Sequence, residues 1–119
     1  MRIERRSERW ARRLPISDLG AGLVGGVSCT AAINHGDGVR VYEAVYGAAH
    51  ENVRPDTANP LPLILPAVEM LKDFGEVAAA DRISRAVDAV LTEGIVRTPD
   101  IGGTATTTAF TDAIVSKLS

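Results

Sequence analysis

Apolar residues recur at helical spacing in several parts of the chain, most clearly between Asn59-Pro60 and Gly75. The repeat there consists of Leu61, Ile64, Leu65, Val68, Leu71 and Phe74. Such spacing predicts an amphipathic helix whose apolar stripe faces the core. Asn59 is a good N-cap and Pro60 suits the first helical position. Gly75 is suited to end the helix, whereas Pro66 removes one helical hydrogen bond and should bend the axis.

Three further helices are predicted from the same kind of pattern. The first runs from Ile16 to Val24, with Ser17 as its cap and Gly25-Gly26 at its end. The second runs from about Glu76 to Thr92, and the last begins at about Thr107. The residues expected to point inward from these last two helices are Ala79, Ile83, Ala86, Val87 and Val90, followed by Phe110, Ala113, Ile114 and Leu118.

One strand, Val39 to Val45, is predicted from its β-branched and aromatic residues in period two. Residues 27–38 before it are rich in turn-forming residues. One strand with four helices leaves backbone N–H and C=O groups without partners on both strand edges. The chain is therefore expected to be a piece of a larger α/β domain, or a subunit that borrows strands from a partner.

Composition restricts the function classes. The 119 residues are 45% hydrophobic and 24% charged, as expected for one small soluble domain without a membrane span. The single cysteine, Cys29, excludes an internal disulfide and suits a reducing cytoplasm. Residues 1–13 hold six of the thirteen basic residues and two of the fifteen acidic ones. The remainder has seven basic against thirteen acidic residues, a net charge of −6, which argues against nucleic-acid binding.

Five blocks of the chain, in their order and spacing, resemble the isocitrate/isopropylmalate dehydrogenase family. They read "ISDLGAGLVGG", "INHGDGVRVYEAVYGAA", "TANPLPLILPAVEMLKDFG", "AADRI" and "RTPDIGGTATTTAFTDAIV". The resemblance implies an α/β fold that is the C-terminal portion of the family's larger domain, mostly helical with one or two strands and an incomplete sheet. Residues 14–119 would be this cofactor-binding part. Residues 1–13 match no family block and are interpreted as a solvated terminus, with a basic arm, a targeting peptide or a frame-shifted gene start as alternatives.

The resemblance also implies a role for the long connection after the predicted strand, which would wrap the adenosine half of NAD. The positions that match the family's cofactor contacts are Tyr46, Gly47, Ala48, Ala49, His50, Glu51, Asn52 and Asn59. Glu51 stands where NAD-dependent members carry an acid that binds the ribose hydroxyls, so NAD is expected over NADP. Asn59 keeps two interpretations, a helix cap and a contact to the adenine edge. Tyr46 and His50 depart from the family, which usually has His and Pro there.

The family's metal site is only partly matched. Its helix carries two carboxylates four residues apart that bind Mg²⁺ or Mn²⁺ with help from a partner subunit. Asp18 matches the second carboxylate, but the first falls at Leu14, which cannot bind a metal. Asp18 with Ser17 is otherwise a plausible capping pair at a helix start. No catalytic acid or base of the family falls within this chain.

The function implied by the resemblance is an NAD-dependent, β-decarboxylating oxidation of a (2R)-hydroxy acid of the isocitrate or 3-isopropylmalate type. The chain would supply the NAD-binding C-terminal part of such an enzyme and would be inactive alone. A homodimer, or pairing with a complete subunit, is expected. The alternatives are a non-catalytic, nucleotide-binding regulatory partner and an inactive truncated remnant.

Overall fold

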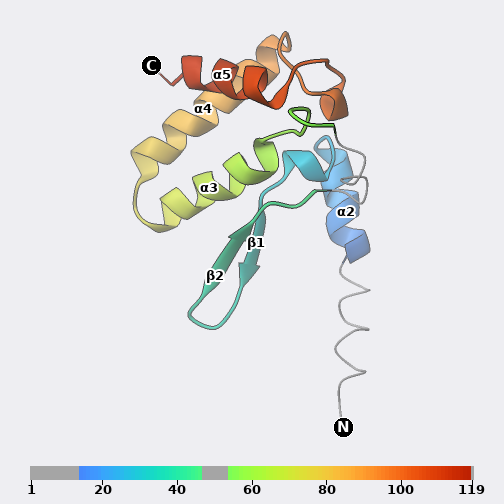
Figure 1. The fold of residues 1–119 in the computed structure, drawn as a ribbon. Coiled ribbons are helices and arrows are strands. Elements are labelled where there is room, and N and C mark those ends of the chain that lie inside the picture. The colour runs from blue at the N-terminus through green and yellow to red at the C-terminus, as the bar shows by residue number, and fades with distance from the viewer. Residues whose placement is uncertain (1–13, 47–53, 119) are drawn as a thin grey trace.

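The computed structural model describes residues 14–46 and 54–118, which form packed helices with a short β-hairpin projecting from one side (Figure 1). In chain order the elements are α2 (Leu14–Leu23), the 3-10 turn η1 (Val27–Cys29), β1 (Ala32–His35), β2 (Arg40–Glu43), α3 (Leu61–Asp73), α4 (Val77–Glu93), the 3-10 turn η3 (Pro99–Ile101) and α5 (Thr107–Ser116). The predicted partial α/β architecture is confirmed. None of the helices in these described ranges is long and apolar enough to cross a bilayer.

The two strands form an antiparallel pair, which corrects the expectation of one strand preceded by turns. Ala32 pairs with Glu43 and His35 pairs with Arg40. The loop is closed by the Gly36 N–H, which donates to the carbonyl of Val39 at 2.8 Å. Gly38 adopts a φ of 70°, a left-handed value that favours glycine. The turn residues at 36–38 therefore mark the tip of a hairpin.

The helix α3 begins and ends as its sequence predicts. Pro60 has helical dihedral angles, φ −79° and ψ −10°, and the Oδ1 of Asn59 accepts the N–H of Leu61 at 2.9 Å. This bond confirms the capping role of Asn59. At the other end Gly75, with φ 85°, and Glu76 donate their N–H groups back to the carbonyls of Lys72 and Leu71. These paired bonds satisfy carbonyls that a helix end leaves without partners.

The core lies between α3, α4 and α5. Its buried members are Leu61, Ala86, Val87, Val90, Phe110 and Ile114. Figure 1 shows α3 and α4 side by side, with α5 on the far side of α4 from the hairpin. Two predicted core positions are wrong: Phe74 is 71% exposed, and on α4 the fully buried alanine is Ala80 and not Ala79. Phe74 follows the last residue of α3, so it lies outside the helix whose apolar stripe packs in the core.

Apolar side chains of α2 and of the hairpin remain on the surface. Ser17 lies inside α2, so it does not cap the start as predicted. The exposed apolar residues of this region include Ile16, Leu19, Leu23, Val24, Val39, Val41 and Val45. Within the described residues the outer edges of β1 and β2 have no further strand beside them. That these elements have neighbours in a larger domain or a partner stays a prediction.

Candidate functional site

The predicted cofactor residues fall on both sides of the gap between the two described ranges. Gly47, Ala48, Ala49, His50, Glu51 and Asn52 lie outside the described residues. Tyr46 is 43% exposed and follows β2 closely, whereas Asn59 is 4% exposed and immediately precedes α3. The structure therefore describes the start and the end of the candidate nucleotide-binding connection, and both ends are held by specific contacts.

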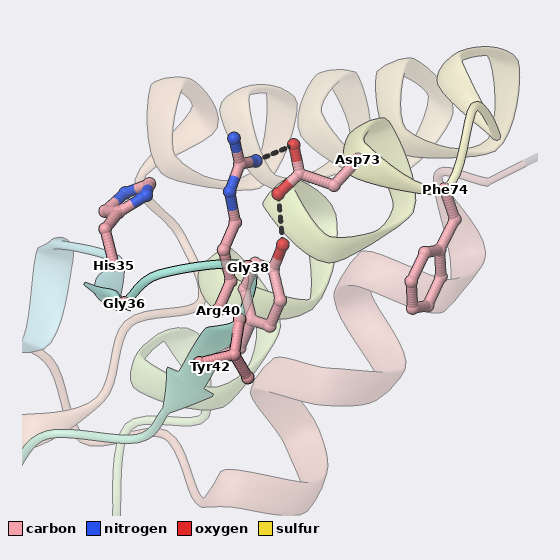
Figure 2. Close-up of a pocket in the computed structure, with 8 residues that line it drawn as sticks. His35, Gly36, Gly38, Arg40, Tyr42, Asp73 and Phe74 are labelled. Carbon is pink, nitrogen blue, oxygen red and sulfur yellow. Dashed lines mark hydrogen bonds and ion pairs between the residues drawn. The ribbon is translucent and has the colours of Figure 1, made fainter.

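At the start, the hairpin is fastened to the C-terminal end of α3. Arg40 forms an ion pair with Asp73, and the hydroxyl of Tyr42 donates to the same carboxylate. Figure 2 shows these two β2 side chains converging on Asp73, beside an open pocket of about 570 Å³. The Arg40 guanidinium, followed by the Tyr42 hydroxyl, lowers the pKa of Asp73, and the bond to Asp73 raises the pKa of Tyr42. Tyr42 is thus half-buried, with its hydroxyl bound to Asp73.

At the end of the connection, Asp56 is fastened to the first turn of α5. Its Oδ1 accepts the backbone N–H of Thr108 at 3.0 Å and the Thr108 hydroxyl at 2.8 Å. Its carbonyl accepts the N–H of Thr107 at 2.9 Å. These bonds hold Asp56 at φ 56°, a left-handed conformation that costs free energy for a residue with a side chain. The hydroxyl of Thr107 also donates to the carbonyl of Ala58 at 2.6 Å.

The bonds to Thr108 lower the pKa of the Asp56 carboxyl below its ordinary value of 3.8. A lowered pKa means that the folded state favours the carboxylate, so its stabilising contribution is complete above pH 3.8 and is lost as pH falls through the lower, folded value. We therefore expect Asp56→Ala to melt below the wild type at neutral pH, and this difference to close under acid conditions. Differential scanning calorimetry from pH 7 to pH 2.5 measures it. Asp88→Ala, at an exposed position on α4, is the control; a pH-independent Asp56 difference would contradict the assignment.

Asn59 uses both ends of its side-chain amide. While Oδ1 caps α3 at Leu61, Nδ2 donates to Oδ2 of Asp100 at 2.9 Å. The other oxygen of Asp100, Oδ1, accepts the hydroxyl of Thr98 at 2.6 Å, and Thr98 is fully buried. This network could not be predicted from the sequence, because Asn59 and Asp100 are 41 residues apart and no local pattern joins them.

The predicted metal ligand, Asp18, does not belong to a group of metal ligands within the described residues. Asp18 lies exposed on α2, with Leu14 one turn before it. Among the residues that the structure describes, no three His, Cys, Asp or Glu side chains are grouped as metal ligands. The described part of the chain therefore does not by itself fit a divalent cation, and no chemical step is assigned to one.

Comparison with known proteins gives consistent results. A family model for isocitrate/isopropylmalate dehydrogenase matches residues 15–114. The isocitrate/homoisocitrate dehydrogenase of Thermus thermophilus is 50% identical over 103 residues, which are 87% of this chain and 30% of that protein. A mitochondrial regulatory subunit of the NAD isocitrate dehydrogenase of Dictyostelium discoideum is 41% identical over 105 residues, again 87% of this chain and 30% of the relative.

A solved structure agrees with the sequence relatives. The isocitrate dehydrogenase of Methylococcus capsulatus has a TM-score of 0.77 at 39% identity, and the match covers 87% of this chain and 31% of that one. The chain thus spans about 30% of the length of the relatives it matches. These matches confirm the resemblance that the five sequence blocks predicted.

Proposed function

The chain belongs to the isocitrate/isopropylmalate dehydrogenase family, and from this membership we propose that it supplies the NAD-binding part of a β-decarboxylating dehydrogenase acting on a (2R)-hydroxy acid. The observation that carries the proposal is the 50% identity to an isocitrate/homoisocitrate dehydrogenase over a range that includes the connection. The hydrogen bonds of Asp56 and Asn59 support it, since a nucleotide loop needs fixed ends.

The nucleotide would be held by the connection between β2 and α3. Tyr46 would offer an aromatic ring, and Gly47, Ala48 and Ala49 would let the backbone approach the adenosine closely. His50, Glu51 and Asn52 would follow along the ribose side. Asn59 would contribute the rest of its amide, because Asp100 engages one of its two amide hydrogens. Bound NAD would supply the hydride acceptor, and a divalent metal would need ligands beyond Asp18.

A second candidate is a non-catalytic subunit that binds nucleotide and pairs with a complete subunit. One relative is named as a regulatory subunit, whereas another is named as a catalytic one, and their identities to this chain, 41% and 45%, are similar. The exposed apolar residues of α2 fit either form of pairing, with a second copy or with a complete subunit.

Titration of the purified 119-residue chain with NAD and with NADP by isothermal calorimetry tests the proposal. We expect saturable binding of NAD, weaker binding of NADP, and no turnover of isocitrate or 3-isopropylmalate by the chain alone. Added to a catalytically complete relative, a regulatory subunit would change that enzyme's rate, whereas a cofactor-binding part of an enzyme would not. Absence of binding to both nucleotides would contradict the proposal and favour an inactive remnant.

Glu51→Ala is expected to weaken NAD binding by about ten- to a hundredfold, because hydrogen bonds to a charged group contribute about 1.5–3 kcal/mol. NADP binding should change far less, since loss of the carboxylate also removes a repulsion with the 2′-phosphate. Glu76→Ala is the matched control, because Glu76 is exposed before α4 and makes no side-chain capping bond there. Equal losses for both nucleotides would contradict the role given to Glu51.

A further inference from the structure

The segment 54–60, which leads from the proposed nucleotide site into α3, is tied to a distant turn by one carboxylate. Asp100 lies in η3 and accepts two hydrogen bonds, one on each oxygen. The donor on one side is Asn59, at the end of the segment, and the donor on the other side is Thr98, which is fully buried. A carboxylate that accepts from two side chains fixes both of them in direction.

The surroundings make this bridge rigid. Thr98 is held by its backbone, since its carbonyl accepts the N–H groups of Ile101 at 3.1 Å and Gly103 at 3.0 Å. Asn59 is held on its other side by the N–H of Leu61. Asp100 also lies close enough to Cys29 of η1 for its charge, after burial, to raise the pKa of that thiol. One negative charge therefore joins η3 to the start of α3, and its field extends to η1.

We propose that Asp100 is a positioning residue: its bridge from Thr98 to Asn59 holds segment 54–60 in the conformation that nucleotide binding requires. The inference rests on the proposed function for its link to NAD. Asp100 need not touch the nucleotide, because both of its oxygens already accept protein donors. It acts through Asn59, whose position sets the direction in which the chain enters α3.

Exchanging the amide and the carboxylate across the bridge tests the proposal. Asn59→Asp keeps an oxygen to cap Leu61, because Asp and Asn are equally good caps, but it sets two carboxylates against each other. In the double variant Asn59→Asp/Asp100→Asn, the new amide at 100 can donate to the carboxylate at 59 and still accept the hydroxyl of Thr98. The single variant breaks the bridge and the double variant rebuilds it with the groups reversed.

Two measurements distinguish the effect on the hydrogen-bond bridge from the effect on nucleotide binding. Hydrogen–deuterium exchange of a peptide covering residues 54–63 is expected to accelerate about tenfold in Asn59→Asp and to return to within about threefold of the wild type in the double variant. NAD affinity is expected to fall about tenfold in Asn59→Asp and to recover at least in part in the double variant, which restores the bridge but not the amide at position 59. Asn34→Asp is the matched control, because Asn34 donates to Glu43 in the same way at an exposed site of the hairpin.

Each outcome decides one question. If the wild type binds neither NAD nor NADP, the proposed function fails, and the exchange data alone still decide whether Asp100 positions the segment. The positioning role is overturned if hydrogen–deuterium exchange of residues 54–63 is unchanged in Asn59→Asp. It is also overturned if the double variant does not return that exchange rate toward the wild-type value. If exchange recovers but NAD affinity does not recover even in part, the whole loss comes from the amide of Asn59 itself, and the link from Asp100 to NAD binding is overturned.

Discussion

Phe110→Ala is expected to remove about 3–5 kcal/mol from the free energy of unfolding. Phe110 is completely buried on α5, where it belongs to the cluster formed with Leu61, Val87 and Val90. Truncation would lose the transfer free energy of the ring and leave a cavity between three helices. Because domains of this size are typically stable by only about 5–15 kcal/mol, this one change would consume much of the total.

The loss of stability should also weaken nucleotide binding, because α5 forms hydrogen bonds to the end of the connection between β2 and α3. Thr107 and Thr108 at the start of α5 bind Asp56, and Phe110 lies two residues further along the same helix. Unfolding in urea, followed by far-UV circular dichroism, measures the change. Phe74→Ala is the matched control, because Phe74 is 71% exposed and should change the free energy of unfolding by less than about 0.5 kcal/mol. A loss below about 1.5 kcal/mol for Phe110→Ala would show that α5 does not pack as described.

The helices could be predicted from the sequence because local features define them. The repeat from Leu61 to Phe74 identifies a helix, and Asn59 and Gly75 mark its limits as the hydrogen bonds confirm. What the repeat cannot give is the position of the neighbouring helix. Phe74 continues the stripe in sequence but follows the last residue of α3, and only the packed structure shows that it is exposed.

The hairpin shows a different limit. Asp37-Gly38 between two extended segments is a hairpin signal, yet β1 has only four residues and two of them, Asn34 and His35, are polar. Such a short segment does not show an apolar alternation. Its pairing with β2 comes from the turn geometry, which is why the pattern over residues 27–38 predicts turns alone.

The candidate site could be predicted only where it is continuous in sequence. The family resemblance identifies the connection as a unit and assigns residues 46–52 and Asn59 to the cofactor. The groups that hold its end come from elsewhere: Asp100 is 41 residues from Asn59, and Thr108 is 52 residues from Asp56. Threonine and aspartate in loops are common, so nothing in their local sequence distinguishes these from solvated side chains.

The turn that carries Asp100 depends on Gly103, where the chain passes directly over Arg97. A Cβ added at Gly103 would lie 2.0 Å from the carbonyl oxygen of Arg97 and 2.5 Å from its carbonyl carbon. That carbonyl also accepts the N–H of Ala105 at 2.8 Å, and Gly103 itself donates to Thr98. The backbone cannot yield at this point without breaking the bonds that hold the turn and lead into α5.

Gly103→Ala is therefore expected to lower the free energy of unfolding by about 3 kcal/mol, at the upper end of the range for overpacking. Neighbouring Gly102→Ala separates the contact from backbone strain, because Gly102 has φ 83° but no atom within 4 Å of an added Cβ. It should lose only about 1–2 kcal/mol. Gly20→Ala, on the exposed surface of α2 with no atom within 4 Å, should gain about 0.5–1 kcal/mol from helix propensity. Chemical denaturation of the three variants ranks them. If Gly103→Ala proved no less stable than Gly102→Ala, residues 97 and 103 would not be in contact, and the turn could not hold Asp100 against Asn59.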